Sequence, residues 1–233
     1  MNNNSFLYKK WLIFSIIFML MSMCLFSSGS YAETAKLTGK VIILDPGHGG
    51  PDGGAVSKQG LIEKNITLPI AKYLRSFYQE AGATVILTRE KDQDLANRGT
   101  KRLNRRKKED LANRIQLIKQ VKPQIVISIH LNAFPRRSAK GAQAFYHPAN
   151  PENKKLSIAI QKELLRHIKN ARSNPSEKKN VYLLKYSTAP TTLIEVGYLS
   201  NRFESNLLSQ PIYQKQLAAC IYYGSLAYFK SKK

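Results

Sequence analysis

The sequence predicts an α/β fold in which a mostly parallel sheet is covered by helices on both faces. From Lys40 onward, short apolar runs alternate with long segments that repeat apolar residues at helical spacing. Strands that alternate with helices usually form parallel sheets, because each crossover helix packs back onto the sheet. The length of 233 residues and the apolar fraction of 43% fit one domain with its own core.

The first strand is predicted over residues 41–44, where aliphatic residues are followed by the glycine-rich loop 45–50. A helix is predicted over 63–80, because apolar residues recur there every three or four positions. Gly82 ends this helix, and the apolar run 84–88 is the next predicted strand.

The remaining elements follow from the same two patterns. A long polar segment over 94–121 is predicted as a helix, and the apolar run 124–129 as a buried strand that ends at His130. The other predicted strands cover 142–146 and 191–195, and the other predicted helices cover 153–171 and 213–229.

The N-terminus carries the pattern of a secretory signal peptide. Lys9 and Lys10 precede an almost wholly apolar run over 11–26, and small residues follow at Ser30 and Ala32. That run is shorter than the ~20 residues that span a bilayer comfortably. We expect residues 1–32 to be a signal peptide cut after Ala32, or an uncleaved N-terminal anchor.

The chain is strongly basic, with 37 Lys and Arg against 15 Asp and Glu and a formal net charge of +22. An exported protein with this charge typically meets a polyanion, such as the cell wall, an acidic membrane surface or extracellular nucleic acid. The two cysteines exclude a disulfide scaffold, because Cys24 lies in the apolar N-terminal run. Cys220, in the closing helix, is expected to be a small buried side chain.

Unusual polar residues lie where three of the predicted strands end. His48 follows the first strand, His130 the third and Glu195 the last. The carboxyl ends of parallel strands meet at one edge of a sheet, and α/β proteins place their chemistry there. We therefore expect these three side chains to lie close together.

With Glu63 at the start of a helix, the two histidines make a donor set typical of catalytic zinc. Two imidazoles and one carboxylate leave a coordination position for water, and zinc lowers the pKa of that water to about 7. Glu195, near the metal but not on it, could take the water's proton and pass it to a leaving amine. Asp45 could hold an imidazole N–H of one ligand.

Each of these residues also has a purely structural interpretation. A histidine at a strand end is most often hydrogen-bonded within the fold. Glu63 is an acid in the first turn of a helix, where the helix dipole favours it. Ligands this far apart in the sequence form no local signature, so spacing alone leaves the zinc hypothesis open.

Six short segments of the sequence favour the zinc hypothesis over the structural interpretation. In order along the chain they are ILDPGHGG (43–50), EKN (63–65), LTR (87–89), LANR (111–114), SIHLNA (128–133) and IEVGYLSN (194–201). Together they resemble the zinc-dependent N-acetylmuramoyl-L-alanine amidases of the amidase 3 type, and the resemblance extends from about residue 40 to residue 229.

The resemblance implies that His48, Glu63 and His130 bind one Zn²⁺ and that Glu195 is the catalytic carboxylate. It also implies a six-stranded, mostly parallel sheet within a single catalytic domain over residues 40–230. The implied reaction is hydrolysis of the amide between the lactyl group of N-acetylmuramic acid and L-alanine of the peptidoglycan stem peptide.

Within that family, a leader followed directly by a catalytic domain is most similar to the germination-specific amidases of endospore formers. This implies action on spore cortex peptidoglycan with muramic δ-lactam formation, in the cell wall or the spore intermembrane space. It leaves room for a protein activator or targeting partner. No nucleic acid is expected as a partner, and a membrane only through an uncleaved N-terminus.

Two alternatives stay open beside the amidase. One is another envelope zinc hydrolase, either a stem-peptide endopeptidase or a polysaccharide deacetylase. The other is a basic wall-binding module without catalysis.

The basic run from Arg98 to Lys108 is expected to be a solvated helix face, or a surface toward stem-peptide carboxylates or anionic wall. Smaller expectations are that Arg89 and Asn132 line the cleft, that His147 and His167 lie on the surface, and that Tyr182, Tyr186 and Tyr198 pack in the fold or contact glycan.

Overall fold

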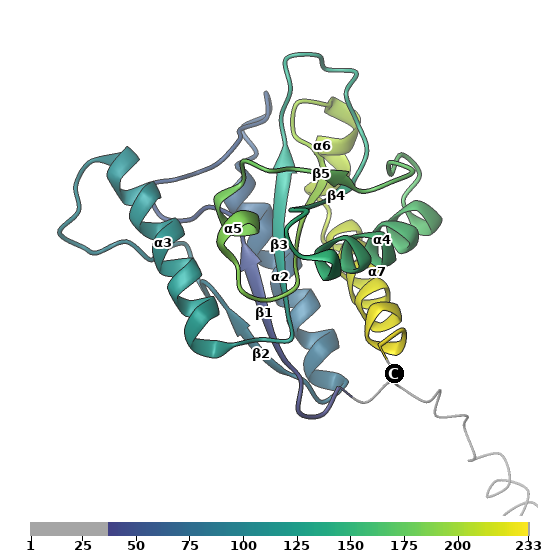
Figure 1. The fold of residues 1–233 in the computed structure, drawn as a ribbon. Helices are drawn as coiled ribbons and strands as arrows, with labels where there is room; N and C mark the ends of the chain where they lie inside the picture. Colours follow the sequence, from purple (N-terminus) through teal and green to yellow (C-terminus); the bar gives the residue numbers. More distant parts are fainter. Residues whose placement is uncertain (1–36, 233) are drawn as a thin grey trace, which may run out of the picture. The chain divides into compact units, whose positions relative to one another are not determined.

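A six-stranded sheet forms the centre of the computed structural model, which describes residues 37–232 (Figure 1). The strands lie in the order β2-β1-β3-β6-β4-β5. Neighbouring strands pair in parallel except β4 with β6, so the predicted mostly parallel α/β sheet is confirmed. The strands are β1 (Val41–Pro46), β2 (Thr84–Leu87), β3 (Ile125–Asn132), β4 (Gln143–Tyr146), β5 (Ser176–Glu177) and β6 (Thr191–Tyr198).

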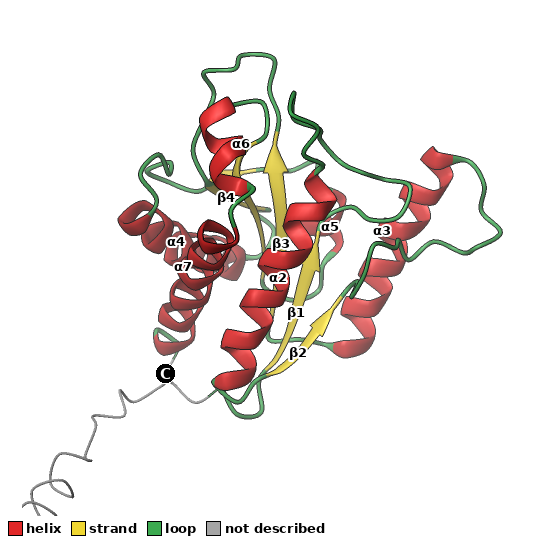
Figure 2. Ribbon diagram, turned by 180° about the vertical axis from the view of Figure 1, so that it is seen from behind, coloured by secondary structure: helices red, strands yellow, loops and turns green. Residues whose placement is uncertain are grey.

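Helices cover both faces of this sheet (Figure 2). Alternate residues of β1 divide between two cores, because successive side chains of a strand point to opposite faces. Ile42 and Leu44 pack into the larger core with α2, α4 and α7, whereas Ile43 packs into a smaller core with α3 and α5. The helices are α2 (Glu63–Glu80), α3 (Leu103–Val121), α4 (Pro151–His167), α5 (Tyr182–Tyr186), α6 (Arg202–Leu208) and α7 (Pro211–Lys230).

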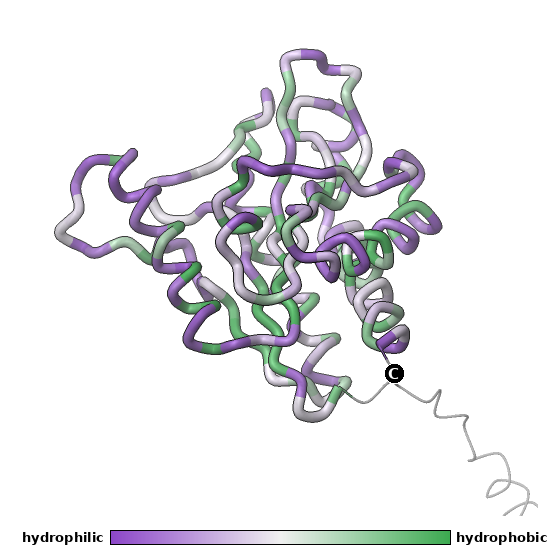
Figure 3. Tube along the Cα trace, in the orientation of Figure 1, coloured by the Kyte–Doolittle hydropathy of each residue, from purple (hydrophilic) through white to green (hydrophobic). Residues whose placement is uncertain are grey.

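Hydropathy follows this layered arrangement. The chain is mostly hydrophobic along the central strands and mostly hydrophilic along α3 (Figure 3). Cys220 on α7 is buried with 3% of its surface exposed, as predicted. No helix within residues 37–232 has the length and apolar character needed to cross a membrane. The predicted signal peptide, residues 1–32, lies outside the described residues.

Helix α3 begins at Leu103, so the prediction of a helix from residue 94 is wrong. Residues 94–102 form a loop that is tied to the helix by Arg106. The Arg106 guanidinium donates to both carboxylate oxygens of Asp94, at 2.9 and 2.6 Å, and to the carbonyls of Asn97 and Thr100. These side-chain contacts stabilise a folded-back loop that polar composition alone cannot distinguish from a helix.

Three short elements are absent from the sequence prediction. They are β5, α5 and α6, of two, five and seven residues. Such lengths are too short to show a periodic pattern. Helix α6 depends instead on Asn201, whose side chain accepts hydrogen bonds from the backbone N–H groups of Phe203 and Glu204.

Helices α4 and α7 approach each other closely at Gly224. A Cβ at this position would lie 2.9 Å from the carbonyl oxygen of Ala159 and would overlap the Cα of Ile160. Glycine is therefore required here for the packing of the two backbones. Nearby, the Tyr78 hydroxyl of α2 lies 2.5 Å from the Ser225 hydroxyl of α7, which joins a third helix to the pair.

Candidate metal centre and active site

Three predicted metal ligands come together at the carboxyl edge of the sheet. His48 lies in the loop after β1, Glu63 is the first residue of α2, and His130 lies in β3. The Glu63 Oε1 atom is 3.1 Å from His48 Nε2 and 3.1 Å from His130 Nδ1. One donor atom from each residue lies within 4.8 Å of the others, so the three side chains could hold a metal ion.

The loop after β1 has a backbone suited to this convergence. His48 has φ of 62°, which is uncommon for a residue other than glycine. A side chain at Gly47 would overlap the His130 imidazole. Gly54 has φ of +73°, and a Cβ there would lie 2.6 Å from Glu63 Oε2 and 2.7 Å from His48 Cδ2. The two glycines therefore leave the space that the three side chains occupy.

Backbone amides hold Glu63 in place. Its Oε2 atom accepts a hydrogen bond of 2.8 Å from the Ala55 N–H, and its Oε1 atom accepts one of 2.9 Å from the Leu131 N–H. The first contact comes from the loop that precedes α2, and the second comes from a strand 68 residues away in the sequence. The carboxylate position is thus set by the loop and by β3, in addition to its own helix.

Asp52 orients His48, a role that the sequence analysis gave to Asp45. The Asp52 Oδ2 atom lies 2.9 Å from His48 Nδ1, and its Oδ1 atom lies 3.0 Å from Lys107 Nζ. The prediction for Asp45 is wrong, because its carboxylate is bonded to Thr88, Ser128 and Arg114 instead.

Asp45 instead joins β1 to its neighbours. Its carboxylate accepts hydrogen bonds from Thr88 Oγ1 at 2.7 Å and Ser128 Oγ at 2.6 Å, and it pairs with Arg114 at 2.5 Å. Burial acts to raise the pKa of Asp45, but Arg114 and the hydroxyl donors outweigh it and lower the pKa to about 2. Arg114 also donates to the carbonyl of His48 at 2.8 Å. The Asp45–Arg114 ion pair therefore also holds the loop after β1 in place.

The electrostatics of the three-residue cluster favour a bound cation. Burial acts to lower the pKa of His48, but hydrogen bonds to Asp52 and Glu63 outweigh it and raise the pKa to about 9. Burial likewise acts to raise the pKa of Glu63, and the two imidazoles outweigh it and hold that pKa well below its usual range. The carboxylate therefore stabilises positive charge on the two imidazoles, and a metal ion that binds here takes the place of those protons.

Glu195 lies beside this cluster. It sits on β6, where it is the register partner of His130 on β3. Its Oε1 atom is 3.2 Å from Lys178 Nζ, and its Oε2 atom is buried with no hydrogen-bond partner among the described residues. Glu195, His48 and His130 line one cavity of about 280 Å³. The structure thus brings together all four residues that the sequence singled out.

Arg89 and Asn132, which were expected to line this cleft, lie outside it. Arg89 is 1% exposed and donates to the carbonyls of Pro46 and Gly47, so it supports the loop from inside. Asn132 does not contribute to the cavity, and its carbonyl accepts from the Leu199 N–H.

The cavity is lined by Tyr182 of α5, but not by Tyr186 or Tyr198. His167 is exposed as predicted, whereas His147 is half-buried and accepts from the Ala149 N–H.

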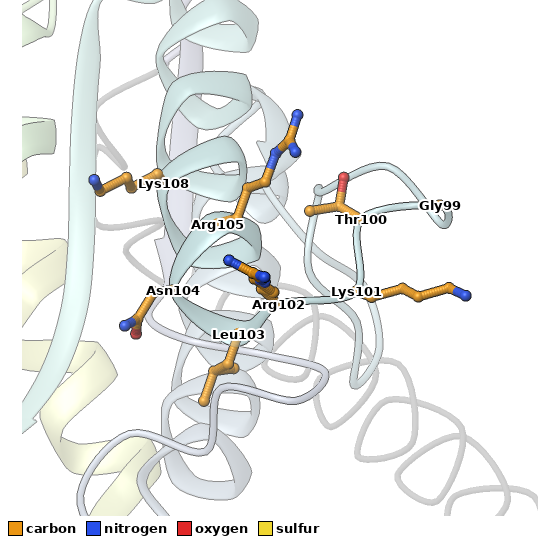
Figure 4. A pocket seen from close by; sticks show the side chains of 8 residues that line it. All are labelled: Gly99, Thr100, Lys101, Arg102, Leu103, Asn104, Arg105 and Lys108. Carbon is orange, nitrogen blue, oxygen red and sulfur yellow. The ribbon is translucent and has the colours of Figure 1, made fainter.

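The basic run divides between the loop 98–102 and the start of α3. Lys101, Arg102, Arg105 and Lys108 of this run line an open pocket (Figure 4). Lys101, Arg102 and Arg105 are exposed, as a solvated surface requires. Lys107, in the same run, reaches the cavity of the candidate site through its contact with Asp52.

Asp52, Lys178 and Arg114 were not assigned roles by the sequence analysis. Asp52 lies only four positions after His48, so a carboxylate close to a predicted ligand was a signal available in the sequence. Arg114 belongs to a segment that carried the family resemblance. Lys178 had no such signal, because it follows a two-residue strand and is one of many lysines.

Comparison with known proteins gives a consistent result. The family model for N-acetylmuramoyl-L-alanine amidase (Amidase_3) matches residues 42–226. The chain is 46% identical over 228 residues to the germination-specific N-acetylmuramoyl-L-alanine amidase of Bacillus subtilis (strain 168), and the match covers 96% of both chains.

Solved structures share the fold. One is the CwlD amidase of Clostridioides difficile in complex with the GerS lipoprotein, with a TM-score of 0.80, 39% identity, and coverage of 82% of this chain and 99% of that one. Another is the N-acetylmuramoyl-L-alanine amidase of Clostridium difficile 630, with a TM-score of 0.73, 29% identity, and coverage of 83% and 98%. The predicted peptidoglycan amidase is thereby confirmed, and the chain belongs to the Amidase_3 family of N-acetylmuramoyl-L-alanine amidases.

Proposed function

We propose that the protein is a zinc amidase in which His48, Glu63 and His130 hold one Zn²⁺ and Glu195 transfers protons. The bond cleaved is the amide between the lactyl group of N-acetylmuramic acid and L-alanine of the stem peptide. The observation that carries the proposal is the meeting of two imidazoles and a carboxylate next to a second carboxylate with an unpaired oxygen. Residues 40–230 are the catalytic domain in this proposal.

The donor set fits zinc. Imidazole nitrogens and a carboxylate oxygen are preferred zinc ligands, and three protein ligands leave a coordination position for water or substrate. Asp52 adds the outer contact that typically fixes a ligating imidazole, since it lies 2.9 Å from His48 Nδ1. When bound, zinc supplies a Lewis acid that lowers the pKa of water and polarises a carbonyl.

Glu195 is the proposed acid and base. Its buried Oε2 atom has no partner within residues 37–232, so it can accept a proton from water as the water attacks the lactyl carbonyl carbon. The same oxygen then donates this proton to the departing L-alanine nitrogen as the C–N bond breaks. The products are a free lactyl carboxylate and a stem peptide with an amino terminus.

The cellular setting is proposed from the relatives. The 46% identity with a germination-specific amidase over 96% of both chains supports spore cortex peptidoglycan as substrate and a role before muramic δ-lactam formation. Cortex peptidoglycan lies outside the cytoplasm, which agrees with residues 1–32 serving as a signal peptide or anchor. The neighbouring structure in complex with a lipoprotein supports a protein partner for activation or targeting.

The test is a digest of purified spore cortex and vegetative peptidoglycan with the full chain, with added zinc or with a chelator. Mass spectrometry should detect free stem peptides that begin with L-alanine, only when zinc is present. Restriction of these products to cortex would support the sporulation role. Cleavage within the peptide, or loss of acetyl groups, would reassign the protein to another class of envelope hydrolase.

A further inference from the structure

We propose that Lys178 is a positioning residue that holds the Glu195 carboxylate by one oxygen and leaves the other free for proton transfer. This inference rests on the proposed function of Glu195. It assigns a role to a lysine outside the segments that carry the family resemblance, and it identifies Oε2 as the oxygen that exchanges the proton.

The backbone of Lys178 is fixed by the sheet. The two-residue strand β5 pairs in parallel with β4, with Phe145 opposite Ser176 and Tyr146 opposite Glu177. Directly after it, the Lys178 N–H donates to the Tyr146 carbonyl at 2.9 Å. The short strand, which lies next to β4 (Figure 1), therefore fixes the backbone of Lys178 at the edge of the sheet.

The side chain then reaches across β4 to β6. Its Nζ atom lies 4.5 Å from the centroid of the Phe145 ring and 3.2 Å from Glu195 Oε1. A cation over an aromatic face is attracted by the ring as well as by the carboxylate. The ammonium group thus has two partners, which restricts the rotamers that this long side chain would otherwise sample.

Lys178 supplies positive charge directly next to the Glu195 carboxylate. The Glu195 side chain is 11% exposed, and a buried carboxylate without a partner is costly. The other lysine and the arginine that line the cavity pair with aspartates, Lys107 with Asp52 and Arg114 with Asp45. Within residues 37–232, Lys178 is the cation paired with Glu195.

The contact involves one carboxylate oxygen only. A carboxylate is planar, so holding Oε1 against the Lys178 ammonium, which itself lies over the Phe145 ring, also restricts the direction of Oε2. Oε2 remains without a partner in the cavity shared with His48 and His130. Removal of the ammonium group should let the carboxylate rotate, and small misplacements of a catalytic group are expensive in rate.

The kinetic test compares K178M, K178R and the neighbouring control K179M on a soluble muropeptide. Lys179 is a suitable control because its side chain is 69% exposed and lies 4.0 Å from Glu177. We expect K178M to lower kcat about 10- to 100-fold with KM and bound zinc unchanged. K178R should recover most of the loss, and K179M should match the unmodified protein. A raised KM with unchanged kcat would overturn the proposal in favour of substrate binding by Lys178.

A double-mutant cycle separates positioning from a general structural effect. In an E195Q background, K178M should cause little further loss of kcat, because the group that it positions can no longer exchange a proton. Multiplicative losses in the double variant would mean that Lys178 acts independently of Glu195, and would also overturn the proposal.

A crystal structure of K178M gives a reading that does not depend on turnover. The Glu195 carboxylate should leave its single position, or occupy several, while His48, Glu63 and His130 stay in place. An unmoved Glu195 contradicts the inference. Absence of amidase products from the unmodified, zinc-loaded protein contradicts the proposed function instead, so the two failures are distinguishable.

Discussion

At the scale of single residues, the candidate site separates two carboxylates by their contacts. Glu63 accepts backbone N–H groups on both of its oxygens and lies 3.1 Å from each of two imidazoles. Glu195 has one oxygen bound to a lysine, and its other oxygen has no partner in the part of the chain that the structure describes. The first arrangement suits a group that stays in place to bind an ion, and the second suits a group that must gain and lose a proton.

This difference gives a prediction for E195A and H48A. E195A should retain zinc and lose activity by at least about 100-fold, because removal of a general acid–base costs that much. H48A should lose both zinc and activity, because it removes one of only three donor side chains. Metal analysis after dialysis, together with product detection by mass spectrometry, checks both variants. Equal zinc loss in the two would instead make Glu195 a ligand.

The sequence identified the four central residues, but not the residues that orient them. His48, Glu63, His130 and Glu195 could be found because they lie in segments that resemble a family. Asp45 was assigned the contact that Asp52 makes, because both lie within four positions of His48 and separation along the chain does not give the direction of a side chain. Lys178 could not be found, because its contact depends on a two-residue strand that pairs with β4, which in turn pairs with β6.

At the scale of elements, buried polar contacts join the sheet to the helices around it. Asp45 of β1 pairs with Arg114 of α3, and Arg114 also pairs with Asp110 at 2.9 Å. On the other face, Gly224 of α7 lets its helix approach the backbone of α4. The Asp45–Arg114 ion pair should respond to pH, whereas the α4–α7 contact should respond to the size of the side chain at position 224. Each can therefore be tested separately.

The Asp45 carboxylate should make stability depend on acid. Its pKa is lowered from 3.8 to about 2 in the folded chain, so its contribution is present above about pH 4 and is lost as the pH falls through 2. That contribution is about 2 kcal/mol, from the size of the pKa shift. Urea unfolding at several pH values should show that D45N has lost this part of the pH dependence. Parallel curves for the two proteins would contradict the assignment.

The α4–α7 contact should not tolerate a methyl group. G224A is expected to lower the free energy of unfolding by about 1–3 kcal/mol, because overpacking forces two backbones apart. G99A is the matched control, since a Cβ at Gly99 meets nothing within 4 Å. Thermal or chemical unfolding measures both variants. A stability loss as large in G99A as in G224A would show that helix separation is not the cause.

Elements with clear signals at both ends could be predicted closely. Helix α2 runs from Glu63 to Glu80 as predicted, because a glycine loop precedes it and Gly82 follows it. Helix α3 begins nine residues later than the predicted residue 94, because the contacts of Arg106 stabilise a loop in a segment of the same polar composition. Local sequence does not contain the long-range hydrogen bonds that decide such a boundary.

At the scale of the whole molecule, positively charged side chains lie beside the candidate metal centre and also on a separate exposed surface. The net charge of +22 includes the exposed side chains at the start of α3 (Figure 4). Peptidoglycan stem peptides carry carboxylates, so we expect such a surface to attract the wall without any specific pocket. The fold and the family followed from sequence patterns, whereas this distribution of charge required the positions of the loops.

The exposed basic surface predicts salt-dependent retention on the wall. Charge reversal in R102E/R105E should weaken binding to intact peptidoglycan at low salt, and the difference should shrink as salt screens the charges. Turnover of a soluble muropeptide should stay the same, because neither residue lines the cavity of the candidate site. Sedimentation with sacculi at several salt concentrations tests binding, and unchanged retention would identify these side chains as solvated only.

The spread of the three ligand residues has a thermodynamic consequence. They come from a loop, a helix and a strand over residues 48–130, so their donor atoms converge only when β1, α2 and β3 have docked. An ion bound by all three therefore binds the native state and not the unfolded chain. Each tenfold rise in free metal above its dissociation constant then adds about 1.4 kcal/mol to the free energy of unfolding. Under the proposed function, the melting temperature of the chain becomes a measure of the zinc available around it.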